Sequence, residues 1–119
     1  MATETKMGGC QCGAVRYEAA GVDLDNVLAC NCSRCGRLGL NLAFVPQDAF
    51  RLLSGGDSLT EYTFNRHKIR HQFCKVCGVQ SFAYGEAPNG AKIAALNVRC
   101  LDGINVHDLK PKQVDGRSF

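Results

Sequence analysis

Hydrophobic and polar positions alternate over most of this 119-residue chain. Val15, Tyr17 and Ala19, for example, fall on one face of an extended segment, and the charged residues between them fall on the other. A period of two residues is typical of half-buried β-strands. The same pattern recurs in residues 42–45, 50–53, 58–65, 68–73, 79–84 and 91–98. The chain is therefore predicted to be mostly β.

Turn and helix signals divide these strands. Residues 54–57 and 87–90 are rich in glycine, asparagine, serine and proline and predict turns, and Pro46 is expected to end a strand. The segments 58–65 and 68–73 are expected to be antiparallel neighbours. Helix signals are few: single turns are expected after Cys32 and at 47–50 and 106–109. The last ten residues are expected to form an irregular tail.

Length and composition fit one small domain, residues 1–119, with a core built from 45% hydrophobic residues. We expect an antiparallel β domain, stabilised by zinc, with minor short helices. No stretch approaches the roughly 20 apolar residues of a membrane span, and no period repeats. Residues 1–6 are polar and lack the apolar run of a secretory signal. These features predict a cytoplasmic protein with no membrane partner.

The formal charge of +3 is weak evidence for a nucleic-acid partner. It counts every cysteine as neutral, whereas one four-thiolate and one three-thiolate zinc site would bring the sum to about 0. The densest basic stretch, residues 66–71, lies in a strand pattern whose alternate side chains leave on opposite faces. We interpret it as a solvated strand and expect no nucleic-acid partner.

The eight cysteines are the most informative chemical feature of the chain. They form three groups and one isolated residue: Cys10 and Cys12; Cys30, Cys32 and Cys35; Cys74 and Cys77; and Cys100. CxC and CxxC spacings put two sulfurs on one turn, where they can bind one metal but are badly placed to bridge each other. The alternative is a small secreted disulfide scaffold. We favour zinc.

Two of the pairs share a pattern. Both Cys12 and Cys77 are followed directly by glycine, which lets the backbone turn with a positive φ and direct N–H groups at the sulfurs. We expect Cys10, Cys12, Cys74 and Cys77 to share one structural zinc. Such a metal would tie the beginning of the chain to its second half.

The loop from Cys30 to Cys35 carries three cysteines within six residues and is predicted to hold a second zinc with one position open to substrate. The alternative is a closed site, completed by Cys100, His71 or His67. Three thiolates soften the metal as a Lewis acid, which suits it to binding another thiol as thiolate. The predicted chemistry is addition of a thiol to a carbonyl, or its reversal. Arg34, inside the loop, is a candidate partner for a substrate carboxylate.

Several segments together resemble the glutathione-dependent formaldehyde-activating enzyme (Gfa-like) family, which is related to centromere protein V. The matching segments are residues 9–17, 30–35, 50–55, 73–78 and 96–98, with Leu101 and Asp102. The resemblance implies a mostly β fold and a carbon–sulfur lyase that forms S-(hydroxymethyl)glutathione from glutathione and formaldehyde. Gly36 departs from the polar or basic residue that is usual after the third loop cysteine, so another small aldehyde or thiol is an alternative substrate.

By matching position, the resemblance implies one structural and one catalytic zinc, the second with full or partial occupancy. Cys10, Cys12, Cys74 and Cys77 would bind the structural zinc, and Cys30, Cys32 and Cys35 would bind the catalytic zinc as the catalytic residues. Two other functions stay open. One is a noncatalytic zinc-stabilised module that binds a protein or nucleic acid, and the other is a redox or metal-transfer role for the three-cysteine loop.

Overall fold

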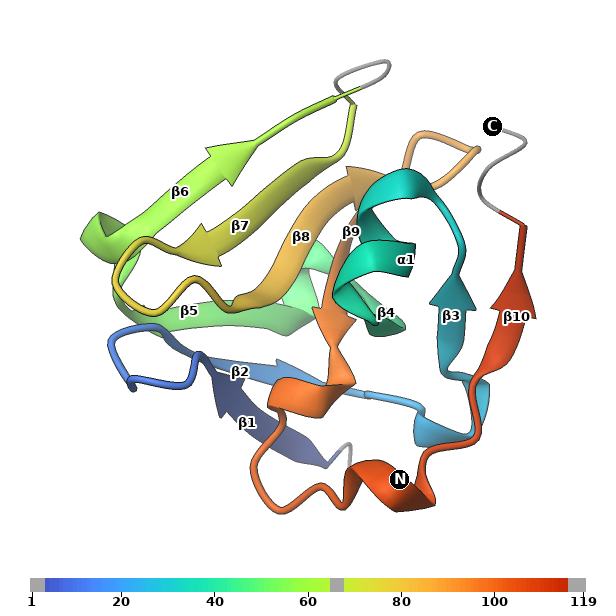
Figure 1. Cartoon of the computed structure of the whole chain (residues 1–119), viewed down its shortest axis with the longest axis horizontal. Helices are drawn as coiled ribbons and strands as arrows, with labels where there is room; N and C mark the ends of the chain where they lie inside the picture. The colour runs from blue at the N-terminus through green and yellow to red at the C-terminus, as the bar shows by residue number, and fades with distance from the viewer. Residues whose placement is uncertain (1–3, 65–67, 116–119) are drawn as a thin grey trace.

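The computed structural model describes residues 4–64 and 68–115 and is mostly β, as predicted. Its strands are β1 (Thr5–Gly9), β2 (Arg16–Ala20), β3 (Leu28–Cys30), β4 (Asn41–Pro46), β5 (Phe50–Ser54), β6 (Leu59–Tyr62), β7 (Arg70–Cys74), β8 (Gln80–Glu86), β9 (Lys92–Asn97) and β10 (Lys112–Val114) (Figure 1). The α-helix found in the described residues is α1 (Ser33–Leu38). Short 3-10 turns are η1 (Leu24–Asn26), η2 (Gln47–Ala49), η3 (Gly56–Ser58), η4 (Val98–Cys100) and η5 (Val106–Asp108).

The strands form two sheets. A three-stranded sheet has the order β1-β2-β5, and a seven-stranded sheet has the order β10-β3-β4-β9-β8-β7-β6. Figure 1 shows β10 beside β3 at one edge of the larger sheet and β6 at the opposite edge. Neighbouring strands are antiparallel except β3 and β10, which are parallel.

Most of the predicted elements are present. The segments expected to be neighbours are β6 and β7, which pair antiparallel with Thr60 opposite Phe73. The three expected helical turns are α1, η2 and η5. Val15, Tyr17 and Ala19 all face the core with 0% exposure, as their alternation predicts. The hydrophobic period therefore predicts correctly which face of β2 is buried.

The predicted irregular tail is wrong in part. Residues 112–114 form β10, which adds to β3 as a parallel edge strand. The strand is stabilised by its backbone: the N–H of Lys112 donates to the carbonyl of Val27 at 2.8 Å, and the N–H of Asn31 donates to the carbonyl of Val114 at 3.2 Å. Because its side chains are mostly exposed, the strand carries no alternating pattern. Backbone pairing at a sheet edge does not require one.

The pattern also misplaces Phe44. It lies among the apolar residues of β4, yet its side chain is 44% exposed, while Ala43 and Val45 are buried. Adjacent residues of a strand point to opposite faces, so Phe44 and Val45 cannot both face the core.

Aromatic side chains from both sheets make the centre of the core. Tyr17 and Phe50 come from the smaller sheet, and Phe82 and Tyr84 come from β8 of the larger one. Ring centroids lie 5.2 Å apart for Tyr17 and Phe50, 4.7 Å for Phe50 and Phe82, and 5.2 Å for Phe82 and Tyr84. Offset and edge-on contacts at these distances are favourable beyond the area they bury. The core thereby fixes how the two sheets meet.

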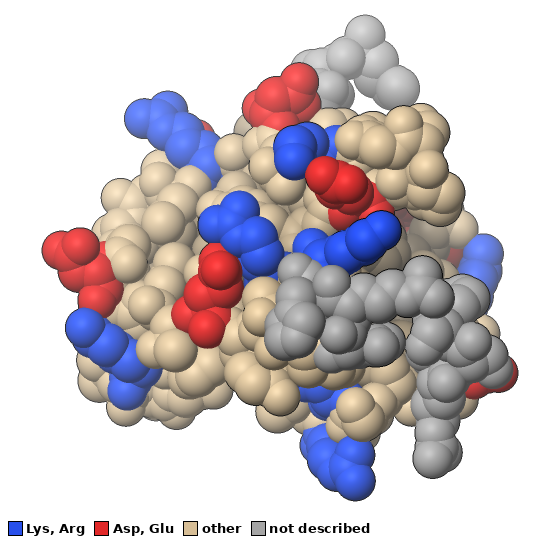
Figure 2. All heavy atoms as spheres, turned by 90° about the horizontal axis from the view of Figure 1, so that it is seen from above, with Lys and Arg blue, Asp and Glu red and all other residues tan. Residues whose placement is uncertain are grey.

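Charge on the face seen in Figure 2 is mixed. Lys and Arg side chains alternate there with Asp and Glu, and the described residues of this face show no stripe of one sign. Nucleic-acid sites are typically marked by a clustered basic surface. Within residues 4–64 and 68–115, no helix has the length and hydrophobicity needed to cross a membrane.

Candidate functional site

The first cysteine group joins the two sheets. Cys10 and Cys12 lie in the turn between β1 and β2, in the smaller sheet. Cys74 ends β7, and Cys77 lies in the turn to β8, in the larger sheet. The ligand atoms of these four residues all lie within 4.8 Å of one another. A metal bound by them would tie the sheets together beside the aromatic core.

The sulfur spacing of this group fits zinc. Sγ of Cys12 lies 3.6 Å from Sγ of Cys10 and 3.7 Å from Sγ of Cys74. Zn–S bonds of about 2.3 Å in a tetrahedron place their sulfurs roughly 3.8 Å apart. Four thiol donors at this spacing are compatible with a bound zinc ion.

Backbone N–H groups converge on the same sulfurs. Sγ of Cys10 accepts from the N–H of Val15 at 3.3 Å, and Sγ of Cys74 accepts from the N–H of Val76 at 3.4 Å. Several hydrogen bonds, the largest contribution coming from the N–H of Val79, lower the pKa of Cys77 to about 6. The glycines that follow each pair, Gly13 and Gly78, have φ of +85° and +83°, as their sequence pattern predicts. Such hydrogen bonds favour the thiolate form that binds metal.

The second cysteine group lies at the start of α1. Cys30 ends β3, Cys32 caps α1, and Cys35 lies inside the helix, with their ligand atoms within 4.8 Å of one another. Sγ of Cys32 accepts the helix N–H of Cys35 at 3.2 Å, and Sγ of Cys30 accepts the N–H of Cys32 at 3.5 Å. Although burial opposes ionisation, the hydrogen bond from Cys35 N–H helps to lower the pKa of Cys32. Burial raises the pKa of Cys35. The three thiol donors suit a soft metal such as zinc.

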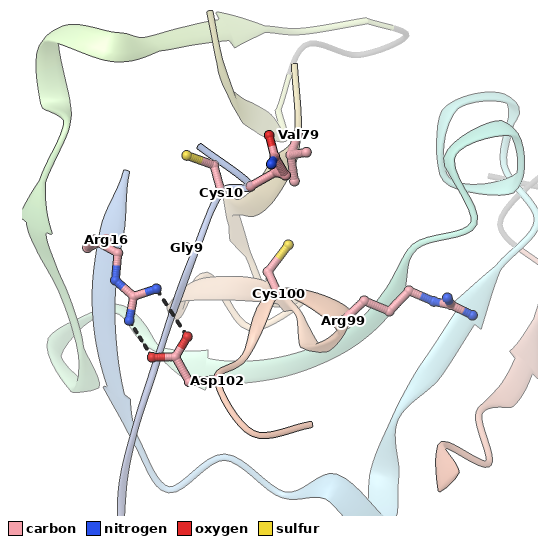
Figure 3. A pocket seen from close by; sticks show the side chains of 8 residues that line it. Gly9, Cys10, Arg16, Val79, Arg99, Cys100 and Asp102 are labelled. Atoms are coloured by element: carbon pink, nitrogen blue, oxygen red, sulfur yellow. Dashed lines mark hydrogen bonds and ion pairs between the residues drawn. The ribbon is translucent and has the colours of Figure 1, made fainter. Parts of the chain in front are cut away.

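Among the described residues, no fourth His, Cys, Asp or Glu completes this second group. Cys100, one sequence candidate, lies elsewhere. Its sulfur is within 3.9 Å of the Gln80 carbonyl oxygen and 3.6 Å of Asn97 Nδ2, and burial raises its pKa to about 11. Figure 3 shows it directed toward Cys10 and Val79, beside a cavity of about 280 Å³. The second candidate, His67, falls outside the described residues.

His71, the remaining candidate for a fourth ligand, is engaged in the core. The side chain is 4% exposed, and its Nδ1 lies 3.0 Å from Nε2 of Gln80. Its Nε2 is buried and has no hydrogen-bond partner among the described residues. Burial, with a smaller effect from the charge of Arg34, lowers the pKa of His71 to about 4. His71 is therefore neutral at pH 7.

Protonation of His71 gives the stability of the fold a distinct pH dependence. Between its ordinary pKa of about 6.5 and the folded value of about 4, the unfolded chain binds a proton that the folded chain does not. The His71 contribution to the free energy of unfolding is thus fully present above pH 6.5 and falls as pH drops toward 4. We expect the wild type to lose up to about 1.4 kcal/mol per pH unit relative to His71→Gln in this window.

Urea denaturation of both proteins at pH 7, 6 and 5 checks this expectation. We expect loss of metal in acid to lower both curves by a similar amount, so the difference between them reports on His71. Curves that stay parallel across this range would contradict the burial argument.

Gln80 is a site residue that the sequence analysis missed. It begins β8, is 5% exposed, and accepts a hydrogen bond from Nε of Arg34 at 2.9 Å. Its even spacing from Phe82 in the sequence was the available signal of burial, but the register shift between β7 and β8 pairs it with Phe73, and it contacts Arg34 and His71 instead of the aromatic core. Through this contact the core holds Arg34, which the sequence identified as a candidate for binding a carboxylate.

Comparison with known proteins places these observations in a family. The family model described as "Glutathione-dependent formaldehyde-activating enzyme" matches residues 5–115. A crystal structure of a protein from Rhodobacter sphaeroides, solved as a structural genomics target, is similar with a TM-score of 0.81 and 29% sequence identity. The similarity covers 91% of this chain and 99% of that one.

Proposed function

Because the chain belongs to the glutathione-dependent formaldehyde-activating enzyme family, we propose that it is a zinc-dependent carbon–sulfur lyase. It adds a thiol such as glutathione to formaldehyde or another small aldehyde, or cleaves the adduct. The protein acts in the cytoplasm, where reduced glutathione keeps cysteine ligands in the thiol form.

The two cysteine groups have different roles. Cys10, Cys12, Cys74 and Cys77 hold a structural zinc, and Cys30, Cys32 and Cys35 hold the catalytic one. When bound to the three-cysteine group, zinc acts as a Lewis acid that stabilises a substrate thiol as its thiolate. The backbone N–H groups of Cys32 and Cys35 keep two of the loop sulfurs in place.

The reaction is a redox-neutral addition. The sulfur of the substrate forms a bond to the carbonyl carbon with its own electron pair. The π bond of the carbonyl breaks, and its electrons pass to the oxygen, which takes up one proton. The thiol proton leaves to water. Cys30 and Cys32 are only partly buried, so solvent can reach the loop for both proton transfers.

The observation that carries this proposal is the three-sulfur group. Three thiols from one loop lie close enough to bind a single metal, and the described residues supply no fourth ligand. A tetrahedral ion held in this way has one position for a substrate, which is the arrangement of catalytic rather than structural zinc sites.

The proposal is tested by measuring exchange between formaldehyde and S-(hydroxymethyl)glutathione by NMR, because the adduct also forms without a catalyst. We expect the zinc-loaded protein to raise the exchange rate above that of buffer, and removal of the metal to abolish the gain. A zinc-loaded protein that leaves the rate at the buffer value with several aldehydes and thiols would reject the enzyme. A noncatalytic zinc-stabilised binding module would then be the better interpretation.

A further inference from the structure

A cavity of about 320 Å³ lies beside the three-cysteine loop. The proposed function gives this cavity no role. It lies between α1 and the β6 end of the larger sheet. It is lined by Ser33, Arg34, Arg37, Leu38, Tyr62 and Phe64. We call it the Arg34 pocket. Leu38 and Tyr62 are 50% and 45% exposed, so the pocket offers apolar walls to a ligand rather than to the core.

The guanidinium of Arg34 is held in this pocket from two directions. Its central carbon lies 4.8 Å from the ring centroid of Tyr62 and 5.8 Å from that of Phe73. Its Nε donates to Oε1 of Gln80 at 2.9 Å. Stacking and one hydrogen bond together fix the plane of the group, and a fixed guanidinium plane is suited to a planar carboxylate.

The contact between Arg34 and Gln80 is built into the core. A guanidinium only donates, so the amide oxygen of Gln80 must face Arg34 and its NH₂ must face His71. Nδ1 of His71 then accepts this hydrogen bond, and the proton of the neutral ring is on Nε2. Phe64 stacks on the same ring at 5.3 Å. Gln80 and His71 are therefore positioning residues for Arg34.

The charge of the pocket is not neutralised. Arg16, Arg51 and Arg70 each pair with a carboxylate, whereas Arg34 and Arg37 make no ion pair with the described residues. The lining contains no acidic side chain. A half-buried guanidinium with no counter-charge favours an anionic ligand.

The pocket borders the three-cysteine loop, because two of its lining residues, Ser33 and Arg34, lie between Cys32 and Cys35. Arg34 is adjacent to Cys35 in the chain, and consecutive Cα atoms are about 3.8 Å apart. A tripeptide thiol extends roughly 3.3–3.6 Å per residue, so its sulfur can lie at the loop while a terminal carboxylate reaches the guanidinium.

We propose that the Arg34 pocket binds a carboxylate of the thiol substrate and so selects anionic thiols over neutral ones. This inference rests on the proposed function and adds the place where the carboxylate of its thiol substrate binds. Arg34 supplies a positive charge and two parallel N–H donors for the carboxylate. The side chains of Leu38, Tyr62 and Phe64 contact the apolar part of the ligand.

Binding of S-methylglutathione tests this assignment without relying on activity, because its sulfur has no proton to lose to a metal. Calorimetry with the zinc-loaded protein compares this acid with its dimethyl ester, in which both carboxylates are neutral. We expect the wild type to bind the ester about 10- to 100-fold more weakly than the acid. Arg34→Gln should lower the affinity for the acid by a similar factor and leave the affinity for the ester unchanged. Arg51→Gln, an exposed arginine on β5, is the matched control and should bind the acid normally.

Two further comparisons separate the possible outcomes. Gln80→Leu should lower the affinity for the acid more than the affinity for the ester, whereas general damage to the fold would lower both affinities. If Arg34→Gln does not fold, the comparison of acid with ester on the wild type and on Gln80→Leu decides. Equal binding of acid and ester, or an Arg34→Gln variant that binds the acid as the wild type does, overturns the assignment.

Failure of the pocket and failure of the enzyme are distinguishable. Catalysed exchange with equal binding of acid and ester would reject the pocket alone. Discrimination against the ester that depends on Arg34, in a protein without exchange activity, would support a carboxylate site and reject the enzyme.

Discussion

Cys12→Ala is expected to unfold the protein at room temperature. The Cys12 side chain is exposed and contributes little to the core, so the loss of a metal ligand is the main physical consequence of the change. Apparent zinc binding of about 10–16 kcal/mol in finger peptides matches or exceeds the roughly 5–15 kcal/mol by which a small domain is stable. Without this metal the two sheets would be joined by core packing and by the contacts of β1 and β2 with Leu101 and Asp102. Circular dichroism and zinc quantification measure the result.

Cys100→Ala is the matched control for this experiment. Cys100 is more buried than Cys12 but belongs to neither sulfur group. We expect it to stay folded, to keep its zinc content and to lose on the order of 1 kcal/mol, the typical cost of a single substitution. If Cys12→Ala melted within a few degrees of the wild type, the structural role of the first group would be wrong.

Cys32→Ser is expected to abolish catalysis and leave the fold intact. The serine hydroxyl can still accept the N–H of Cys35 and cap α1, so the change removes a thiolate donor without removing the cap. The protein should lose one zinc and keep the other. The exchange rate should fall by on the order of 10²–10³-fold, the usual cost of deleting a principal electrostatic group from an active site.

The difference between Cys32→Ser and Cys12→Ala is the informative result. Exchange kinetics, zinc content and thermal melting of Cys32→Ser should show one metal, no activity and a melting temperature near that of the wild type. Unfolding of Cys32→Ser as complete as that of Cys12→Ala would mean that the second group is structural too, and the enzyme proposal would lose its main support.

The sequence predicted the grouping of the sulfurs because this property is local. A CxC or CxxC turn followed by glycine brings two sulfurs together whatever the rest of the chain does. Cys10 and Cys74 are 64 positions apart, yet the repeated pattern was enough to pair them. Strands with one buried face, such as β2, were predictable for a similar reason, since they carry a period of two.

The remaining features depend on contacts between distant segments. Strand β10 is stabilised by backbone hydrogen bonds at a sheet edge and carries no side-chain period. The path from Arg34 through Gln80 to His71 joins α1, β8 and β7, and nothing in the spacing of these residues links them. The Arg34 pocket was therefore visible only once the chain was folded.

The central claim is that the loop from Cys30 to Cys35 holds a zinc with a position left for a substrate thiol. A crystal structure of the zinc-loaded protein soaked with glutathione, with anomalous data at the zinc edge, tests it most directly. We predict zinc at both cysteine groups and the glutathione sulfur within bonding distance of the zinc at Cys30, Cys32 and Cys35. A protein side chain as the fourth ligand of that zinc, or loop sulfurs bonded to one another with no metal, would contradict the account.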